Sequence, residues 1–267
     1  MMNGVQILLT NDDGIQSPGL WAAAEALSGL GYVHVVAPRD QYSGAGRSMP
    51  STSDGIIKPH PLVVHGKQWT VYSVGGSPAQ SVEHALLEIL PSKPDLVVSG
   101  INFGENASVG ITASGTVGAA MEAATFGIPA LAISLEMGPE HYFSHSEDID
   151  FSVAGHFAAF FGQLLLEKKL LHDVHLINVN VPGTATIETP WKVCRLSPDA
   201  YFELFPPQRQ SWDEPAQVGF RLVPNPKYAP GTDCYVLHIE KKVAVTPLSL
   251  DLTSRVDFDK LDSILRC

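Results

Sequence analysis

The strongest constraint on the fold is the alternation of short apolar runs with helix-like segments over the first 135 residues. Residues 95–99 form an almost wholly apolar run, as the central strands of parallel sheets usually do. Similar runs cover 5–9, 33–38 and 130–135, and segments with helical spacing of apolar residues lie between them. Because βαβ units place helices on both faces of a parallel sheet, the alternation predicts an α/β fold. We expect a Rossmann-like three-layer α/β/α core with a mostly parallel sheet.

The pattern continues to about residue 182 and then changes character. Further strands are expected over 69–74 and 175–181, and helices over 17–31, 78–90, 116–126 and 151–171. After this point prolines cluster among aromatic residues and short strand-like runs, which is typical of hairpins and irregular segments. We therefore expect a core over 1–182 and a hairpin-rich C-terminal extension over 183–267 for oligomerisation. Part of the extension, including residues 243–248, is expected to return to the core.

Composition narrows the class of partner. The chain carries 17 Lys and Arg against 28 Asp and Glu, a formal net charge of −11, without a Lys/Arg cluster. Nucleic acid polymers would be repelled, whereas a cation and backbone N–H groups can neutralise a small anion locally. No apolar run approaches the ~20 residues of a membrane helix, and no secretory signal pattern is found. The three cysteines are far apart and form no C-x-x-C pair, so we expect a reduced, cytoplasmic protein without membrane partners.

Two adjacent carboxylates follow the first expected strand. Asp12 and Asp13 lie at its carboxyl end, where open α/β sheets bind their ligands. Neighbouring carboxylates repel each other by ~1–4 kcal/mol between water-like and surface dielectric constants, and a divalent cation relieves that repulsion. An Asx-turn or a helix cap would also place Asp and Gly here. The pair is a candidate cation site that needs support from its neighbours.

Loops after two other expected strands supply neutral polar groups. Ser43 lies in a Gly/Ser loop and offers a hydroxyl, although a flexible connection has the same composition. Asn102 could give a cation an amide oxygen, and Asn106 could donate an N–H group to phosphate. Ser114 and Thr116 open the next helix, where hydroxyls and backbone N–H groups form either an anion site or a simple cap. Together the loops predict a cation held by oxygen ligands beside a phosphate cradle.

These loops belong to segments that match one known family in order along nearly the whole chain. The segments are ILLTNDDGIQSPG at 7–19, APRDQYSGAGRSM at 37–49, VVSGINFGEN at 97–106, SGTVGAAMEA at 114–123, NVNVP at 178–182, Thr232-Asp233, and VAVTPL at 243–248. In all of them the chain resembles the SurE family, the survival-protein-E nucleotidases.

The resemblance implies a phosphoric monoester hydrolase that removes phosphate from nucleoside monophosphates. It would be a divalent-metal-dependent 5′-nucleotidase, with possible 3′-nucleotidase and exopolyphosphatase activities. The implied ligands of one Mg²⁺ or Mn²⁺ per subunit are Asp12, Asp13, Ser43 and Asn102. The implied phosphate contacts are Asn106, Ser114, Gly115 and Thr116, and the implied catalytic residues are Asp12, Asp13 and Asn106. The resemblance also implies homodimers or homotetramers, with the extension packed between subunits.

The chain departs from the family pattern in three places. Residues 76–81 are Gly-Ser-Pro-Ala-Gln-Ser, where the family often has Gly-Thr-Pro with Asp and Cys two and three residues further on. Ala107 and Ser108 stand where Leu-Gly is usual, and Ala113 stands where an aromatic residue or His often precedes Ser-Gly-Thr. The implied metal ligands are all retained. The departures therefore bear on base preference, subunit packing and catalytic efficiency.

Other classes of phosphate-handling protein fit less well. Phosphate monoester hydrolysis needs acceleration of up to ~10²¹, which calls for a covalent nucleophile or a metal. No Cys is followed by five residues and Arg, no Arg-His-Gly occurs, and Asp148 and Asp150 precede a helix pattern rather than follow a strand. The dinucleotide motif G-x-G-x-x-G is missing after the first strand, and the P-loop-like spacing of Gly110 and Gly115 is not followed by Lys. The alternative that stays open is a non-catalytic nucleotide-binding or scaffold protein that retains the fold.

The remaining conspicuous side chains receive structural interpretations. His141 and His145 are four residues apart but are not expected to bind a metal. The aromatic residues of the extension are expected to pack within it or at a subunit interface, with the alternative that one reaches over a neighbour's active site. They are Trp191, Tyr201, Phe202, Phe205 and Trp212.

Overall fold

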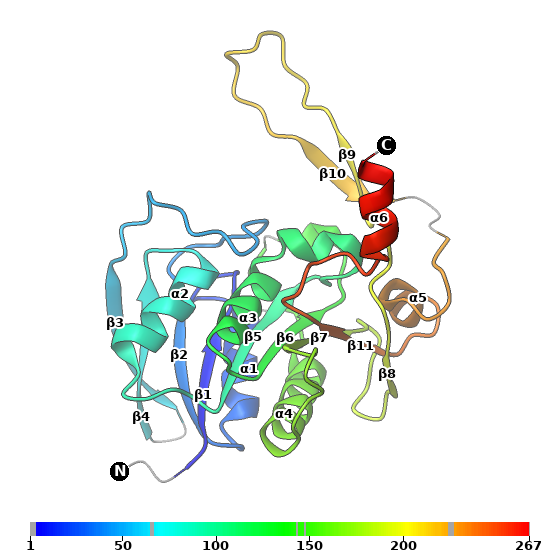
Figure 1. Ribbon diagram of the computed structural model, residues 1–267. Helices are drawn as coiled ribbons and strands as arrows, with labels where there is room; N and C mark the ends of the chain where they lie inside the picture. The colour runs from blue at the N-terminus through cyan, green and yellow to red at the C-terminus, as the bar shows by residue number, and fades with distance from the viewer. Residues whose placement is uncertain (1–3, 65–66, 143, 147, 224–226, 267) are drawn as a thin grey trace.

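The computed structural model describes residues 4–64, 67–142, 144–146, 148–223 and 227–266. Its centre is a nine-stranded sheet of order β3-β4-β2-β1-β5-β6-β7-β11-β8, with helices on both faces (Figure 1). The strands are β1 (Gln6–Thr10), β2 (Tyr32–Pro38), β3 (Ile57–Val64), β4 (Lys67–Val74), β5 (Leu96–Phe103), β6 (Ala130–Leu135), β7 (Leu176–Val181), β8 (Trp191–Val193) and β11 (Val243–Leu248). The predicted α/β class with a mostly parallel sheet is confirmed.

Helices of very different length connect these strands. The longer ones are α1 (Pro18–Leu27), α2 (Pro78–His84), α3 (Gly115–Thr125), α4 (Ser152–Glu167) and α6 (Phe258–Leu265), and the shorter ones are η1 (Ala85–Ile89), η2 (Ser108–Ala113), η3 (Pro139–His141) and α5 (Asp233–His238). Proline at the first helical position opens both α1 and α2, as the sequence indicated for α1. The segment expected as one helix over 78–90 divides into α2 and the π-helical turn η1.

Two layers of helices cover the sheet, and alternate residues of each strand face one layer or the other. Ile7 and Leu9 of β1 belong to the cluster of apolar side chains that includes α1 and α4. Leu8 faces the opposite cluster, which includes residues of α2 and α3. This alternation is the two-residue period of a strand that is buried on both faces.

The topology places a switch point beside β1. β1 pairs in parallel with β2 on one side and with β5 on the other. The chain continues from β1 into one half of the sheet through β2, and it later enters the other half through β5. Loops that leave the carboxyl ends of the two inner strands diverge there and form a crevice. Asp12 follows β1 and Asn102 lies near the end of β5, so both residues sit at this crevice.

Toward each edge the sheet contains one antiparallel pairing. β3 runs antiparallel to β4 at one edge, and its Pro59 and Pro61 are tolerated because an edge strand need not donate every N–H group. At the other end β11 runs antiparallel to β7, and β8 pairs with β11. Residues 243–248 of the extension thus lie in the central sheet, while the division of the chain at residue 182 stays a prediction.

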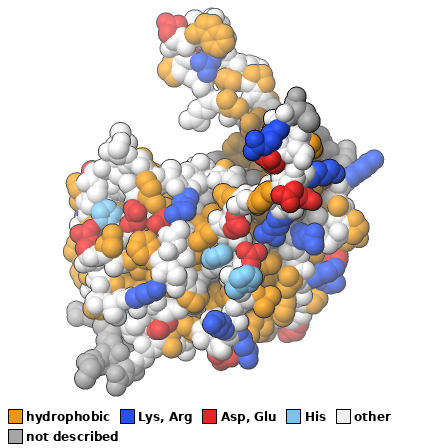
Figure 2. Space-filling model, in the orientation of Figure 1, with side chains coloured by type: hydrophobic (Ala, Val, Ile, Leu, Met, Phe, Trp, Pro, Cys, Tyr) orange, Lys and Arg blue, Asp and Glu red, His pale blue; other side chains and the backbone are white. Residues whose placement is uncertain are grey.

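A two-stranded hairpin projects from the body of the molecule (Figure 1). Its antiparallel strands are β9 (Phe202–Phe205) and β10 (Gly219–Leu222). Figure 2 shows hydrophobic side chains spread over this projection. None of the helices in the described part of the chain is long and apolar enough to span a lipid bilayer.

Candidate active site

The turn after β1 buries both carboxylates of the Asp12–Asp13 pair. Asp12 Oδ1 accepts a hydrogen bond of 2.5 Å from the Thr116 hydroxyl. Asp13 accepts hydrogen bonds of 3.2 Å from Gln41 Nε2 and from the backbone N–H of Phe103. The two side chains are therefore fixed by three different segments of the chain, β5, α3 and the loop after β2.

Burial makes this pair of charges unfavourable in the metal-free protein. Burial raises the pKa of Asp12, although hydrogen bonds from the side chain and backbone of Thr116 and from the backbone of Gly115 lower it. Burial also raises the pKa of Asp13 well above its ordinary value, and the charge of Asp12 raises it further. A cation between the two carboxylates would offset both the loss of hydration and the repulsion between the two negative charges, because each carboxylate would then contact a positive charge.

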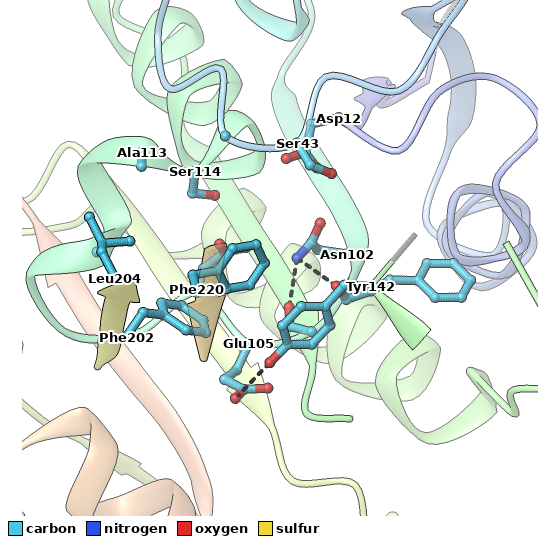
Figure 3. A pocket seen from close by; sticks show the side chains of 15 residues that line it. Asp12, Ser43, Asn102, Glu105, Ala113, Ser114, Tyr142, Phe202, Leu204 and Phe220 are labelled. Atoms are coloured by element: carbon cyan, nitrogen blue, oxygen red, sulfur yellow. Dashed lines mark hydrogen bonds between the residues drawn. The ribbon is translucent and has the colours of Figure 1, made fainter. Parts of the chain in front are cut away.

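The remaining candidate ligands carry neutral oxygen atoms. The Asn102 side-chain nitrogen donates to the backbone oxygen of Gly104 at 2.6 Å, and Figure 3 shows the side-chain oxygen directed toward Asp12 and Ser43. In the described residues no group of three or more His, Cys, Asp and Glu side chains is arranged to hold a metal. Two carboxylates with a hydroxyl and an amide oxygen make a hard, all-oxygen donor set, which fits Mg²⁺ or Mn²⁺ rather than a softer ion.

The loop that carries Ser43 packs directly on the start of α3. The Gly46 N–H donates to Ala113 O at 2.9 Å, and the Tyr42 N–H donates to Asp12 O at 2.7 Å. A Cβ atom on Gly118 would lie 2.3 Å from Gly46 O, so this approach requires glycine. Ser43 therefore takes its position from Asp12 and from α3.

The start of α3 serves both Asp12 and the pocket. Ser114 is the N-cap, and its hydroxyl accepts the Val117 N–H at 3.1 Å. A Cβ atom on Gly115 would lie 2.7 Å from Asp12 Cβ, which explains the glycine at this position. The hydroxyl and the backbone N–H of Thr116 are both hydrogen-bonded to Asp12, so the start of α3 orients this carboxylate.

Strand β7 holds the loop that carries Asn106. The Asn106 N–H donates to Asn180 Oδ1 at 2.8 Å, and the Asn106 backbone oxygen accepts from the side chains of Asn178 and Asn180 at 2.8 and 2.9 Å. The Asn106 side chain donates one N–H to Ser134 Oγ at 2.9 Å. The NVNVP segment thus has a clear structural role, which is to clamp the backbone of this loop.

Ser108 stands where the resemblance led us to expect glycine, and its backbone has a positive φ of 58°. Its N–H donates to Asp233 Oδ2 at 2.7 Å, while Asp233 Oδ1 accepts the Ser197 N–H at 2.8 Å. A left-handed conformation is costly for a residue with a Cβ atom and needs support from its surroundings. Asp233 of α5 supplies that support.

These residues surround a cavity of about 300 Å³. Five predicted residues line it, and they are Asp12, Ser43, Asn102, Asn106 and Ser114. Three others, Asp13, Gly115 and Thr116, contact Asp12 or Phe103 behind the lining. Other lining residues were missed from the sequence, and they are Glu105, Tyr142, Phe202, Leu204 and Phe220. The aromatic clustering of the extension was a signal for Phe202 and Phe220, but the sequence could not place the hairpin beside the pocket.

Glu105 begins a chain of buried polar contacts that leads away from the cavity. Glu105 Oε1 accepts hydrogen bonds from the hydroxyls of Tyr201 and Tyr142, and the Tyr201 hydroxyl lies 2.9 Å from His238 Nε2. His238 Nδ1 in turn lies 2.8 Å from a carboxylate oxygen of Glu136. Burial raises the pKa of Glu105, although the hydrogen bond from Tyr201 lowers it. Glu105 Oε2 has no hydrogen-bond partner among the described residues.

Comparison with known proteins finds relatives along nearly the whole chain. The family model described as "Survival protein SurE" matches residues 7–203. The protein named 5′-nucleotidase SurE from Thermococcus gammatolerans is 44% identical, over 98% of this chain and 96% of that protein. The protein of the same name from Archaeoglobus fulgidus is 39% identical, over 96% and 95%. The crystal structure of the SurE protein from Aquifex aeolicus superposes with a TM-score of 0.74 at 33% identity and covers 98% of each chain.

Proposed function

The chain belongs to the SurE family, and from that premise we propose that it is a divalent-metal-dependent phosphatase that hydrolyses nucleoside 5′-monophosphates to nucleoside and phosphate. One observation carries the proposal beyond the family name. Two adjacent carboxylates are buried together at the switch point of the sheet, and the start of a helix lies directly beside them. A protein that only needed a stable turn would gain nothing from burying both charges.

In this proposal Asp12, Asp13, Ser43 and Asn102 hold one Mg²⁺ or Mn²⁺ per subunit. When bound, the cation polarises the phosphate and lowers the pKa of a coordinated water. Burial of the carboxylates and the hydrogen bonds from Thr116 and Phe103 support this assignment, because they orient the acidic oxygens before any ligand arrives.

The phosphate oxygens are held by the side chain of Asn106 and by the start of α3 at Ser114, Gly115 and Thr116. N–H groups at the start of a helix stabilise negative charge, and that charge grows during phosphoryl transfer. Asn106 keeps one side-chain N–H beyond the hydrogen bond to Ser134, because an amide nitrogen carries two donors. Either Asp12 or Asp13 acts as the general base toward the attacking water.

The proposal also includes activity on nucleoside 3′-monophosphates and on short polyphosphates. It further includes a homodimeric or homotetrameric assembly and a cytoplasmic location. The rival is a nucleotide-binding or scaffold protein that retained the fold without catalysis. Both hypotheses predict nucleotide binding, so turnover has to separate them.

The test is phosphate release from 5′- and 3′-nucleoside monophosphates and tripolyphosphate, each with Mg²⁺, Mn²⁺ or EDTA. We expect turnover with a metal and its loss in EDTA. Asp12→Asn should remove most of the activity and also the rise in Tm that Mn²⁺ causes in the wild-type protein. Nucleotide binding without phosphate release in either metal would support the scaffold instead, and near-normal turnover of Asp12→Asn in Mn²⁺ would refute the metal assignment.

A further inference from the structure

The cavity beside Asp12 has two chemically different ends. Asp12, Ser43 and Asn102 line one end, and the hairpin residues Phe202 and Phe220 line the other (Figure 3). A volume of about 300 Å³ lies at the lower limit for small-molecule sites and exceeds what a phosphate group alone requires. The phosphate end therefore leaves space for the rest of the substrate on the aromatic side.

One face of the β9–β10 hairpin forms this aromatic side. Because side chains alternate along a strand, Phe202 and Leu204 share a face, and Phe220 lies directly opposite Leu204 on β10. The opposite face carries the Glu203–Arg221 ion pair, with 2.9 Å between Arg221 Nη2 and Glu203 Oε2. One face of the hairpin is thus apolar and turned to the cavity, and the other carries this ion pair together with Phe205.

Contacts among aromatic rings fix the position of this face. The Phe202 ring packs edge-on against Tyr142, Tyr201 and Phe220, with centroid distances of 6.5, 4.9 and 5.5 Å. Tyr201 is buried, and its ring stacks on His238 at 5.5 Å with an interplanar angle of 13°. The hydroxyl of Tyr201 is also hydrogen-bonded to Glu105 beneath the cavity. The base of the hairpin is therefore anchored in the core, although its tip projects into solvent.

We propose that Phe202 and Phe220, with Tyr142 beside them, form the subsite for the nucleobase, and that Tyr201 is the residue that positions it. The inference rests on the proposed nucleotidase function and adds what recognises the substrate beyond its phosphate. An aromatic face stacks on any base, because every base has a π-face. Of the polar groups nearby, Glu105 Oε1 and the Tyr142 hydroxyl are hydrogen-bonded to each other at 3.4 Å, and Glu105 Oε2 is buried. Recognition therefore depends on ring area, and purines bind better than pyrimidines.

The experiment compares substrates that differ only in the base. AMP, GMP, CMP and ribose 5-phosphate present a similar phosphate to the metal end, and ribose 5-phosphate has no base. In Phe202→Leu and Phe220→Leu the preference for AMP over ribose 5-phosphate, as a ratio of kcat/KM values, should fall about tenfold. The inhibition constant of adenosine should rise by a similar factor, while that of inorganic phosphate should change much less.

Phe205→Leu is the matched control, because Phe205 lies on the same hairpin but on the face turned away from the cavity. The inference is overturned if Phe202→Leu lowers kcat/KM equally for AMP and ribose 5-phosphate, or if Phe205→Leu has the same effect. The inference is also contradicted if the kcat/KM values of the wild-type enzyme differ more between AMP and GMP than between AMP and CMP, because a subsite that recognises only ring area would not distinguish two purines.

A second measurement keeps the two proposals apart. If no phosphate is released from any nucleotide, the proposed function is refuted. The nucleobase subsite can still be tested by calorimetry, which measures adenosine binding to the same proteins. Binding that is weakened in Phe202→Leu and retained in Phe205→Leu supports the subsite. Absent binding, or equal binding by both variants, refutes it.

Discussion

At the scale of single residues, Thr116 shows how closely catalysis and folding are joined in this site. Its hydroxyl donates to Asp12 in a fully buried position, and a hydrogen bond to a charged group contributes about 1.5–3 kcal/mol. Thr116→Val keeps the shape of the side chain and removes the donor. We expect kcat/KM for AMP with Mn²⁺ to fall at least about tenfold and the Mn²⁺ affinity to fall with it.

The control for this variant lies on the same helix. Thr125 sits in the last turn of α3, where its hydroxyl donates to Glu122 O at 2.6 Å, away from the pocket. Thr125→Val should leave metal affinity and turnover close to the wild-type values. Equal losses in both variants would mean that α3 is destabilised as a whole and that Asp12 has no special dependence on Thr116.

Glu105 makes a prediction about pH. Its pKa is raised in the folded protein by burial, so the folded state binds more protons than the unfolded state above the unfolded value of about 4.3. The stability that this carboxyl contributes is present below that value and is lost as pH rises through the folded pKa. Glu105→Gln removes the titration, so its free energy of unfolding should increase relative to wild type as the pH rises above about 4.3.

The measurement is urea unfolding in EDTA across that pH range, since bound metal would add its own pH dependence. Glu203→Gln, at an exposed position on the hairpin, serves as the control. The prediction is contradicted if the difference in free energy of unfolding between Glu105→Gln and wild type is constant with pH, because the Glu105 carboxyl would then have the same pKa in the folded and unfolded states.

At the scale of secondary-structure elements, the contact between α3 and the loop after β2 decides where Ser43 lies. Helix propensity alone predicts that Gly118→Ala stabilises α3 by about 1 kcal/mol. The new Cβ atom would lie 2.3 Å from Gly46 O, so the steric cost exceeds the gain. We expect this variant to unfold at lower urea concentration and to bind Mn²⁺ more weakly, because Ser43 is displaced.

Gly155→Ala in the first turn of α4 is the comparison, since a Cβ atom there meets Ala26 Cβ at 3.4 Å and Ala22 O at 3.5 Å, which are ordinary contacts. This substitution should be neutral or stabilising by up to about 1 kcal/mol, without effect on metal binding. If Gly118→Ala proved as stable as Gly155→Ala, the loop would have to be more mobile than its hydrogen bond to Ala113 indicates.

Elements with a strong local pattern could be predicted from the sequence, and elements that depend on distant packing could not. The central strand β5 is indicated by the apolar run over 95–99, although it extends through the expected loop to Phe103. In contrast, β3 contains two prolines, which argue against a strand unless its place at the edge of the sheet is known. Helix α5 has only six residues, and no periodic pattern can develop over that length. Its stability comes from burial of residues such as Cys234 and Leu237.

The same distinction applies to the site. Asp12 and Asn102 could be placed because the carboxyl ends of neighbouring parallel strands must meet, whatever the details of packing. Glu105 was within the matched segment, but its burial depends on Tyr201, which lies 96 residues further along. Phe202 could not be assigned to the pocket, since the fold of a projecting hairpin does not follow from periodicity.

At the scale of the whole molecule, the C-terminal helix α6 carries an exposed apolar side. Phe258, Leu261, Ile264 and Leu265 are between 39% and 76% exposed, and their spacing places them on one stripe of the helix. We predict that this stripe contributes to the proposed homo-oligomer. Leu261→Glu combined with Ile264→Glu should give a species of lower mass in size-exclusion chromatography with light scattering.

The matched control is Lys260→Glu, which changes the net charge by the same amount on a polar position of α6. It should leave the mass unchanged. A wild-type protein that is monomeric at micromolar concentration, or a double variant with the wild-type mass, would exclude α6 from any assembly.

The hydrogen bond between Ser108 and Asp233 spans 125 positions of the chain. During synthesis a protein emerges from its N-terminus, so every side chain assigned to the metal and the phosphate leaves the ribosome long before Asp233 does. The loop that carries Asn106 reaches its final conformation only after Asp233 has been synthesised, because the Asp233 carboxylate supports the costly backbone conformation of Ser108. A nascent chain that is cut short after the parallel strands would carry all the proposed ligands and still lack a finished site. The moment at which the site is completed is thus set by the synthesis of the segment around Asp233.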